Sequence, residues 1–205
     1  MINTGEVEIG YSVGPDNGPP MLMLHGVTSR RDTFLRMMDS LTPHYRVITM
    51  DQRGHGYSGH APGKYARDDH AGDIKFVIEN VCNGQPIVWG HSMGGGNAVA
   101  LAGKQPELFR ALILEDPGIM SRKRPEEFTE SPTIKQFKTF LGLIEAGLSV
   151  EEMAPKLQET APNQPEYFAP WKAECLMQMD VEILKNVVEG KSRGGSDPAE
   201  SLANI

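Results

Sequence analysis

Four short apolar runs divide the first half of the chain, and segments with helical periodicity lie between them. The runs are Met21–Leu24, Val47–Met50, Ile87–Trp89 and Ala111–Leu114. Met21–Leu24 is continuous, and a continuous apolar run of this length is typical of a strand that is buried in a parallel sheet. The alternation of strand and helix therefore predicts an α/β fold with a mostly parallel sheet and helices on both of its faces.

The remaining elements of the first half are expected between and before these runs. A short strand is expected over Val7–Val13, and helices are expected over 33–41, 67–81 and 94–104. The last of these helices is unusually rich in small residues.

From about residue 120 the apolar positions recur with the period of helices, at Ile134, Phe137, Leu141 and Ile144. Ser149–Glu152 has the form of a capping box that opens another helix. Two further helices are expected over Glu166–Met179 and Val181–Val188, with Gly190 as a C-terminal cap residue. No strand signal is found in this part.

This change of period divides the chain into three expected parts. Residues 1–117 would form the α/β core, 118–195 a helical cap, and 196–205 the lead-in to further core strands. Most of the large apolar side chains of the cap are expected to pack its helices together, and some to face the site. They are Phe128, Phe137, Phe140, Met153, Phe168, Trp171, Met177 and Met179.

Composition excludes several classes of partner. The formal net charge of −7 and the pI of about 5.4 argue against nucleic acid and anionic membranes. No signal peptide is found, and no apolar stretch approaches the ~20 residues of a membrane helix. Cys82 and Cys175 form no disulfide or metal pattern, so reduced thiols and a cytoplasmic location are expected. Without metal-ligand spacing, a phosphate loop or a dinucleotide fingerprint, no cofactor or metal is expected.

The segment Gly90-His91-Ser92-Met93-Gly94 stands between the third apolar run and the helix of small residues. A serine on a sharp strand-to-helix turn is held in a strained conformation that exposes its hydroxyl above the sheet. The turn is so tight that the residues two before and two after the serine must lack bulk, which Gly90 and Gly94 provide. Ser92 is therefore predicted to be a nucleophile. The alternative is a surface serine in a glycine-rich turn.

A second segment, His25-Gly26-Val27-Thr28, directly follows the first apolar run. Acyl transfer requires donors aimed at the oxyanion that develops on the carbonyl oxygen. Two backbone N–H groups are expected to form this oxyanion hole, one from Met93 and one from Val27. His25 is interpreted as a histidine bonded to nearby loop backbone, because it precedes the nucleophile and lies on another loop.

The chain resembles the α/β-hydrolase superfamily, and within it the capped esterases and related carboxylic-ester or carbon–carbon hydrolases. The resemblance rests on Leu24–Gly26, Asp51–Ser58, Gly90–Gly95 and Leu112–Pro117, which follow the order and spacing of that family. These motifs cover roughly residues 5 to 118 and are specific for the fold rather than for a substrate.

No histidine occurs between Ser92 and Ile205, whereas the resemblance implies that an Asp and the catalytic His follow the cap. We therefore expect the C-terminal strands that carry them to lie outside this chain. In some members of the superfamily the acid follows the strand that ends here at Leu114. Glu115, or Asp116 beside it, is a candidate for the acid on that basis.

The other polar residues of the first half receive structural interpretations. Asp51 and Arg53 are expected to fix the loop in which they lie. His55, His60 and His70 are each interpreted as surface or loop-structural histidines.

The leading hypothesis is a hydrolase that acts through a Ser92 acyl-enzyme on an ester, lactone, thioester or carbon–carbon bond. The cap favours a small-molecule substrate with an apolar acyl or aromatic part. Two alternatives are a catalytically dead ligand-binding homologue and one fragment of a split or nicked hydrolase. The expected macromolecular partner is the C-terminal remainder of the fold or another copy of the chain.

Overall fold

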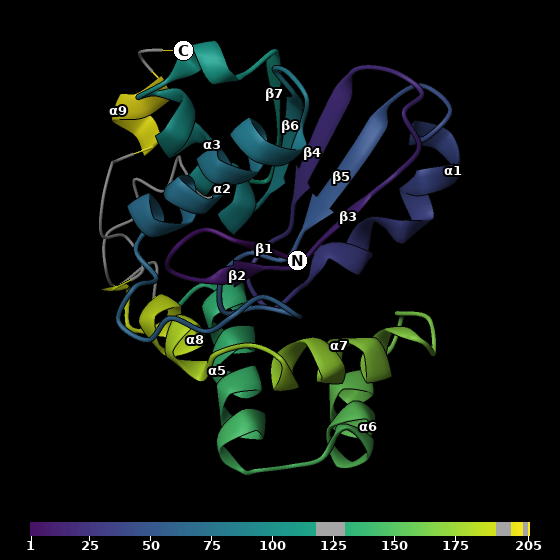
Figure 1. Ribbon diagram of the computed structural model, residues 1–205. Helices are drawn as coiled ribbons and strands as arrows, with labels where there is room; N and C mark the ends of the chain where they lie inside the picture. Colours follow the sequence, from purple (N-terminus) through teal and green to yellow (C-terminus); the bar gives the residue numbers. More distant parts are fainter. Residues whose placement is uncertain (118–129, 192–197, 203–204) are drawn as a thin grey trace.

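The computed structural model describes residues 1–117, 130–191, 198–202 and 205, and its centre is a five-stranded sheet (Figure 1). The strand order is β3 (Tyr11–Val13), β5 (Arg46–Met50), β4 (Pro20–Leu24), β6 (Ile87–His91) and β7 (Ala111–Glu115). Only β3 runs antiparallel to its neighbour. The predicted α/β fold with a mostly parallel sheet is therefore confirmed.

Helices cover both faces of the sheet, as predicted. Helices α2 (Arg67–Val81) and α3 (Met93–Ala102) lie on one face (Figure 1). The 3-10 helix η1 (Arg31–Met37) and α1 (Met38–Leu41) lie on the other. A second 3-10 turn, η2 (Pro106–Leu108), precedes β7.

The alternation of side chains along β4 supplies both halves of the core. Leu22 and Leu24 pack in the cluster formed with α2 and α3, whereas Met21 and Met23 pack with Phe34 of η1. A strand that is buried on both faces must be apolar throughout, which is why the predicted runs are continuous.

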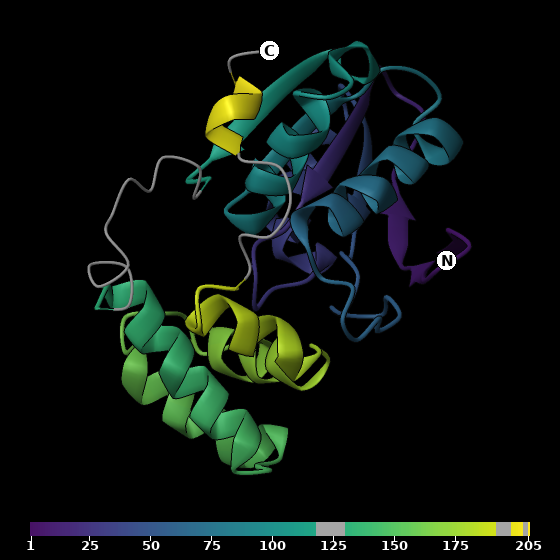
Figure 2. The same ribbon diagram turned by 90° about the vertical axis from the view of Figure 1, so that its left-hand side faces the viewer.

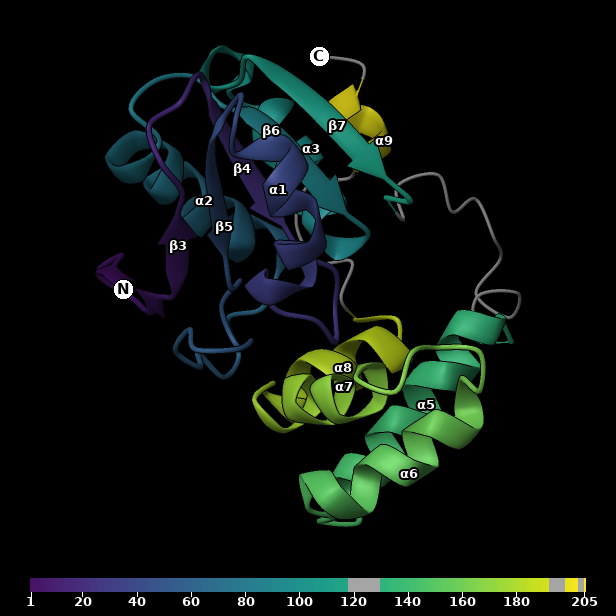
Figure 3. The same ribbon diagram turned by 90° about the vertical axis from the view of Figure 1, so that its right-hand side faces the viewer.

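The second half forms a separate helical layer beyond one end of the sheet (Figures 2 and 3). Its helices are α5 (Pro132–Glu145), α6 (Val150–Thr160), α7 (Phe168–Met177) and α8 (Val181–Val188). The layer has its own apolar core, in which Phe140, Met153 and Met179 are buried. Phe128 lies outside the described residues. The division of the chain at residues 117 and 195 remains a prediction.

Local sequence signals set the ends of these helices. The Ser149 hydroxyl accepts from the Glu152 N–H while the Glu152 carboxylate accepts from the Ser149 N–H, so the predicted capping box is confirmed. Gly190 follows α8 with a φ of +72°, a left-handed conformation that suits glycine at a helix end.

One predicted strand differs from expectation. The strand predicted over Val7–Val13 is split into β2 (Glu8–Ile9), which pairs with β1 (Ile2–Asn3), and β3. The split falls at Gly10, whose N–H donates to Ser58 Oγ and whose carbonyl accepts from the Asp51 N–H. The backbone of Gly10 therefore forms its hydrogen bonds with Asp51 and Ser58, and the strand is interrupted at this residue.

Strand β7 is an edge of the sheet in the part that the structure describes. Its residues alternate between half-buried and exposed, and Ile113 is 38% exposed. The short helix α9 (Pro198–Leu202) packs against α3, and Ser201 lies against Gly103. Pairing of β7 with a C-terminal remainder or another copy stays a prediction.

Among the described residues, no helix combines the length and the apolar character needed to cross a membrane.

Candidate active site

Ser92 occupies the turn between β6 and α3 with φ +49° and ψ −113°, a backbone conformation that serine rarely adopts. Its N–H donates to the carbonyl of Glu115 on β7 at 2.9 Å, which ties the turn to the sheet. Residues held in such strained conformations cluster at functional sites. The strained strand-to-helix turn predicted from the sequence is present.

The glycines on either side of Ser92 are required by contact distances. A Cβ placed on Gly90 would lie 2.5 Å from the Cα of Gly95, and one on Gly94 would lie 2.5 Å from the carbonyl oxygen of Leu24. Both contacts are with backbone and cannot be relieved by a rotamer change. The prediction that Gly90 and Gly94 must lack bulk is confirmed.

The loop after β4 lies directly against the turn. A Cβ on Gly26 would be 3.2 Å from Ser92 Cβ and 2.7 Å from His91 Nδ1. Val27 follows Gly26 in this loop, and Met93 opens α3, where the first N–H groups of a helix lack intrahelical acceptors. The structure thus brings the segments of Val27, Ser92 and Met93 together. Their roles in catalysis remain predictions.

His25 is a structural histidine, as predicted. The ring is fully buried, its Nδ1 lies 2.8 Å from the Gly26 carbonyl, and its Nε2 accepts from the Gln52 N–H at 3.0 Å. Because Nε2 is an acceptor, the proton lies on Nδ1 and is donated to Gly26. Burial lowers the pKa of His25 to about 4. Both nitrogens are occupied, so this imidazole is not a free base.

His55 and His70 are buried rather than superficial. The His55 ring packs edge-on against His25 with centroids 5.0 Å apart, and its Nδ1 lies 3.0 Å from the Arg53 carbonyl. His70 lies on α2 beside Tyr65. Burial lowers the pKa of each to about 3. For these two, the surface alternative is wrong, because His55 lies in a loop that is folded into the protein and His70 is one of the buried residues of α2.

His60, in contrast, is exposed at the surface, where its Nδ1 lies 3.7 Å from a carboxylate oxygen of Asp180.

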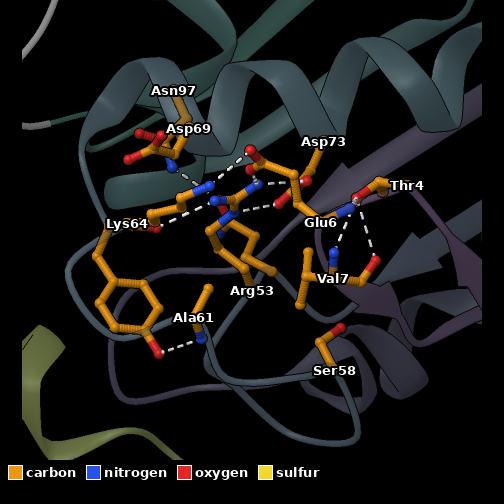
Figure 4. Close-up of polar contacts among 12 residues, drawn as sticks. Thr4, Glu6, Val7, Arg53, Ser58, Ala61, Lys64, Asp69, Asp73 and Asn97 are labelled. Atoms are coloured by element: carbon orange, nitrogen blue, oxygen red, sulfur yellow. Dashed lines mark hydrogen bonds and ion pairs between the residues drawn. The ribbon is translucent and has the colours of Figure 1, made fainter.

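Asp51 and Arg53 fix their loop, as predicted. The Arg53 guanidinium donates twice to the carboxylate of Asp73, at 2.6 and 2.8 Å, and once to the Lys64 carbonyl (Figure 4). The carboxylate of Asp51 accepts the backbone N–H groups of Arg31 and Tyr57. The side chains of Asp51 and Arg53 are therefore occupied in holding this loop.

The two acid candidates differ in their surroundings. The Glu115 carboxylate accepts from the indole of Trp89 at 3.1 Å, and Trp89 packs with the apolar cluster on the sheet face opposite α3. Asp116 is exposed and has a φ of +43°, in the left-handed region. The carboxylate of Glu115 is therefore hydrogen-bonded to Trp89, whereas Asp116 is the residue with the strained backbone conformation.

A set of long-range contacts that sequence reasoning missed holds α7 against the loop after β4. Arg30 donates to Glu174 and Gln178 at 2.8 Å each, and Trp171 donates from its indole to Asp32 at 2.8 Å. The three partners, Trp171 and Glu174 of α7 and Gln178 at its C-terminal cap, recur at intervals of three and four residues and thus share one face. That polar stripe on an otherwise apolar helix is the signal that could have revealed the contact.

Helix α8 is held in the same way against the loop after β5. The Asp180 N–H donates to the Gly54 carbonyl, and the Asp180 carboxylate accepts from Tyr65 at 2.6 Å. The Glu182 carboxylate accepts the Gly63 N–H. The helical layer is thereby attached to the segments that follow β4 and β5. No group of three His, Cys, Asp or Glu residues suited to a metal ion is found among the described residues.

Comparison with known proteins places this geometry in a family. The model of the alpha/beta hydrolase fold family matches residues 19–171, so the chain belongs to that family.

Two curated relatives illustrate the range of activities in the family. The chain is 39% identical over 100 residues to 2-(acetamidomethylene)succinate hydrolase of Mesorhizobium japonicum, a match that covers 49% of this chain and 36% of that protein. It is 28% identical to the pimeloyl-[acyl-carrier protein] methyl ester esterase of Nitrosospira multiformis, over 95% of this chain and 78% of that one. The first match thus spans well under half the length of the relative.

Among solved structures, N-formylmaleamic acid deformylase of Pseudomonas putida superposes with a TM-score of 0.79 at 24% identity, covering 97% of this chain and 75% of that one. A likeness at this identity shows the fold. The two curated relatives described above are hydrolases, and this chain is a member of the alpha/beta hydrolase fold family.

Proposed function

We propose that this protein is a serine hydrolase in which the hydroxyl of Ser92 attacks the carbonyl carbon of a carboxylic ester or related acyl bond. The observation that carries the proposal is the strained Ser92 at the start of α3, with the Gly26 loop pressed against it. Strain of about 1–3 kcal/mol persists only where the surrounding structure enforces it.

In this proposal the tetrahedral intermediate is stabilised by the backbone N–H groups of Val27 and Met93. A lost oxyanion donor typically costs about 2.7–4 kcal/mol of transition-state stabilisation. Of the two carboxylates at the end of β7, Asp116 is the better acid. Glu115 is held by Trp89, whereas the strain at Asp116 is of the kind found at functional residues.

The three buried histidines are poor candidates for the general base. His25 is bonded through both nitrogens, and burial lowers the pKa values of His55 and His70 to about 3, which makes their imidazoles weak bases. This observation favours a second candidate function for residues 1–205 by themselves, namely ligand binding without turnover.

Substrate and location follow as parts of the same proposal. The named relatives act on a succinate derivative and on a pimeloyl ester, both of which are carboxylic acid derivatives with an aliphatic chain. An ester, lactone or thioester with an apolar acyl part is the substrate class proposed here. The two free, buried cysteines are in keeping with a cytoplasmic protein.

Labelling with a fluorophosphonate, followed by mass spectrometric mapping, tests the nucleophile. We expect a single labelled residue, Ser92, and loss of the label in Ser92→Ala but not in Ser40→Ala, which alters an exposed serine of α1. Label on another serine, or label that survives Ser92→Ala, would refute the proposal. A protein that resists labelling but binds ligand would support the ligand-binding alternative.

A further inference from the structure

Lys172 is the only cationic residue of helix α7, and its half-buried side chain points toward the loop after β4. The Nζ atom donates to the Thr28 carbonyl at 2.7 Å and lies 3.4 Å from the Thr28 hydroxyl. The rings of Trp171 and Phe168 flank it, with centroids at 5.0 and 5.8 Å. All of these contacts are with neutral groups.

In the part of the chain that the structure describes, no carboxylate forms an ion pair with Lys172. The acidic side chains of the same neighbourhood, Asp32 and Glu174, accept hydrogen bonds from Arg30 instead. Burial lowers the pKa of Lys172, against a small opposing effect of Cys175. A desolvated cation without a counter-ion is costly and is found where a ligand supplies the opposite charge.

The loop that accepts the hydrogen bond from Lys172 also contacts the candidate nucleophile. Thr28 follows Gly26 by two residues, a separation of at most about 7 Å of chain. Gly26 in turn lies against Ser92. Helix α7 is on the side of the helical layer that faces the sheet, as Figures 1 and 3 both show. The ammonium group thus lies against the same loop that contacts Ser92.

We propose that Lys172 binds a free carboxylate on the substrate, so that the enzyme acts on acyl compounds that carry a second, unreacted acid group. The inference rests on the proposed function, because it assumes that the substrate lies between α7 and Ser92. The Thr28 hydroxyl is a second donor beside the ammonium group. Two donors match the two oxygens of a carboxylate, whereas a phosphate offers three acceptor oxygens and a higher charge.

Calorimetric titration with a matched pair of probes tests this subsite. The probes are 4-phenylbutyrate and the neutral 4-phenylbutyramide, which differ in charge but hardly in shape. Lys172→Gln removes the charge but keeps a donor for the Thr28 carbonyl. Lys156→Met removes an exposed positive charge from the same helical layer and is the control.

We expect Lys172→Gln to weaken binding of the acid at least about tenfold and binding of the amide less than about twofold, because a desolvated charge pair is lost only with the acid. Lys172→Arg should restore the acid's affinity to within about fivefold of wild type, and Lys156→Met should change neither probe.

Equal weakening of both probes would mean that Lys172 only clamps α7 to Thr28, and the proposal would be wrong. Absence of acid binding by the wild-type protein would also overturn it. If circular dichroism shows that Lys172→Gln does not fold, the wild-type protein and Lys172→Arg are compared instead. Both should bind the acid more tightly than the amide, and equal affinities for the two probes would overturn the proposal. Fluorophosphonate labelling of Ser92 is read separately, so failure of the hydrolase proposal remains distinguishable.

Discussion

The protein contains three buried histidines, and we expect its free energy of unfolding to decrease at acidic pH because of them. His25, His55 and His70 are at most 3% exposed. Burial lowers their pKa values to about 4, 3 and 3 in the folded protein, against about 6.5 in an unfolded chain. A depressed folded-state pKa contributes stability that is fully present above the unfolded value and is lost as the pH falls toward the folded value.

The size of the effect follows from the number of protons. Below about pH 6 and above about pH 4 the unfolded chain holds up to three more protons on these rings than the folded protein does. Each proton corresponds to about 1.4 kcal/mol per pH unit, so the free energy of unfolding should fall by up to about 4 kcal/mol per pH unit. A domain stability of about 5–15 kcal/mol would be exhausted within a few pH units.

Urea unfolding followed by tryptophan fluorescence, at steps from about pH 7 to about pH 5, measures this slope. His55→Gln should reduce the slope by about one proton, whereas His60→Gln, which alters an exposed ring, should leave it unchanged. A slope below about 1.4 kcal/mol per pH unit, or equal slopes for the two variants, would refute the reasoning.

Two further predictions concern the turn and the acid. Gly94→Ala should destabilise the protein by about 1–3 kcal/mol or more and block labelling of Ser92, because its Cβ would press on the Leu24 carbonyl. Gly72→Ala, in an open position of α2, should be neutral or stabilising by up to about 1 kcal/mol; equal thermal shifts would contradict the steric argument. Asp116→Asn should lower p-nitrophenyl ester turnover at least about 100-fold and Glu115→Gln less than about threefold, and the reverse order would make Glu115 the acid.

The fold and the turn that carries Ser92 could be predicted because both depend on residues that are close together in the sequence. The four mainly apolar runs predict strands, and β4, β5, β6 and β7 form there, with β4 and β5 buried and β7 half-exposed at the edge of the sheet. The glycines around Ser92 were predicted from the tightness of one turn, which involves neighbours in sequence. The capping box at Ser149 is likewise a contact over three residues.

The polar attachments of the helical layer could not be predicted, because each joins residues more than a hundred positions apart. Nothing local to Arg30 indicates that Glu174 will be its acceptor. The burial of His55 is also a tertiary effect, since a loop of polar residues normally lies at the surface, and the burial of His70 depends on what packs against α2. Only the regular spacing of polar residues on α7 was open to a sequence argument.

The attachment of α7 and α8 to loops of the sheet has a consequence for recombination between relatives. Residues 131–190 are contiguous in sequence, but the unit they belong to is not, because α7 depends on Arg30 and Asp32 and α8 on Tyr65. In a chimera that exchanges only the helices, the polar side chains of α7 and α8 would face loops that lack the matching hydrogen-bond partners. The exchangeable module therefore consists of three separate stretches, the loop after β4, the loop after β5 and the helices, and crossover points should be chosen so that all three come from one parent.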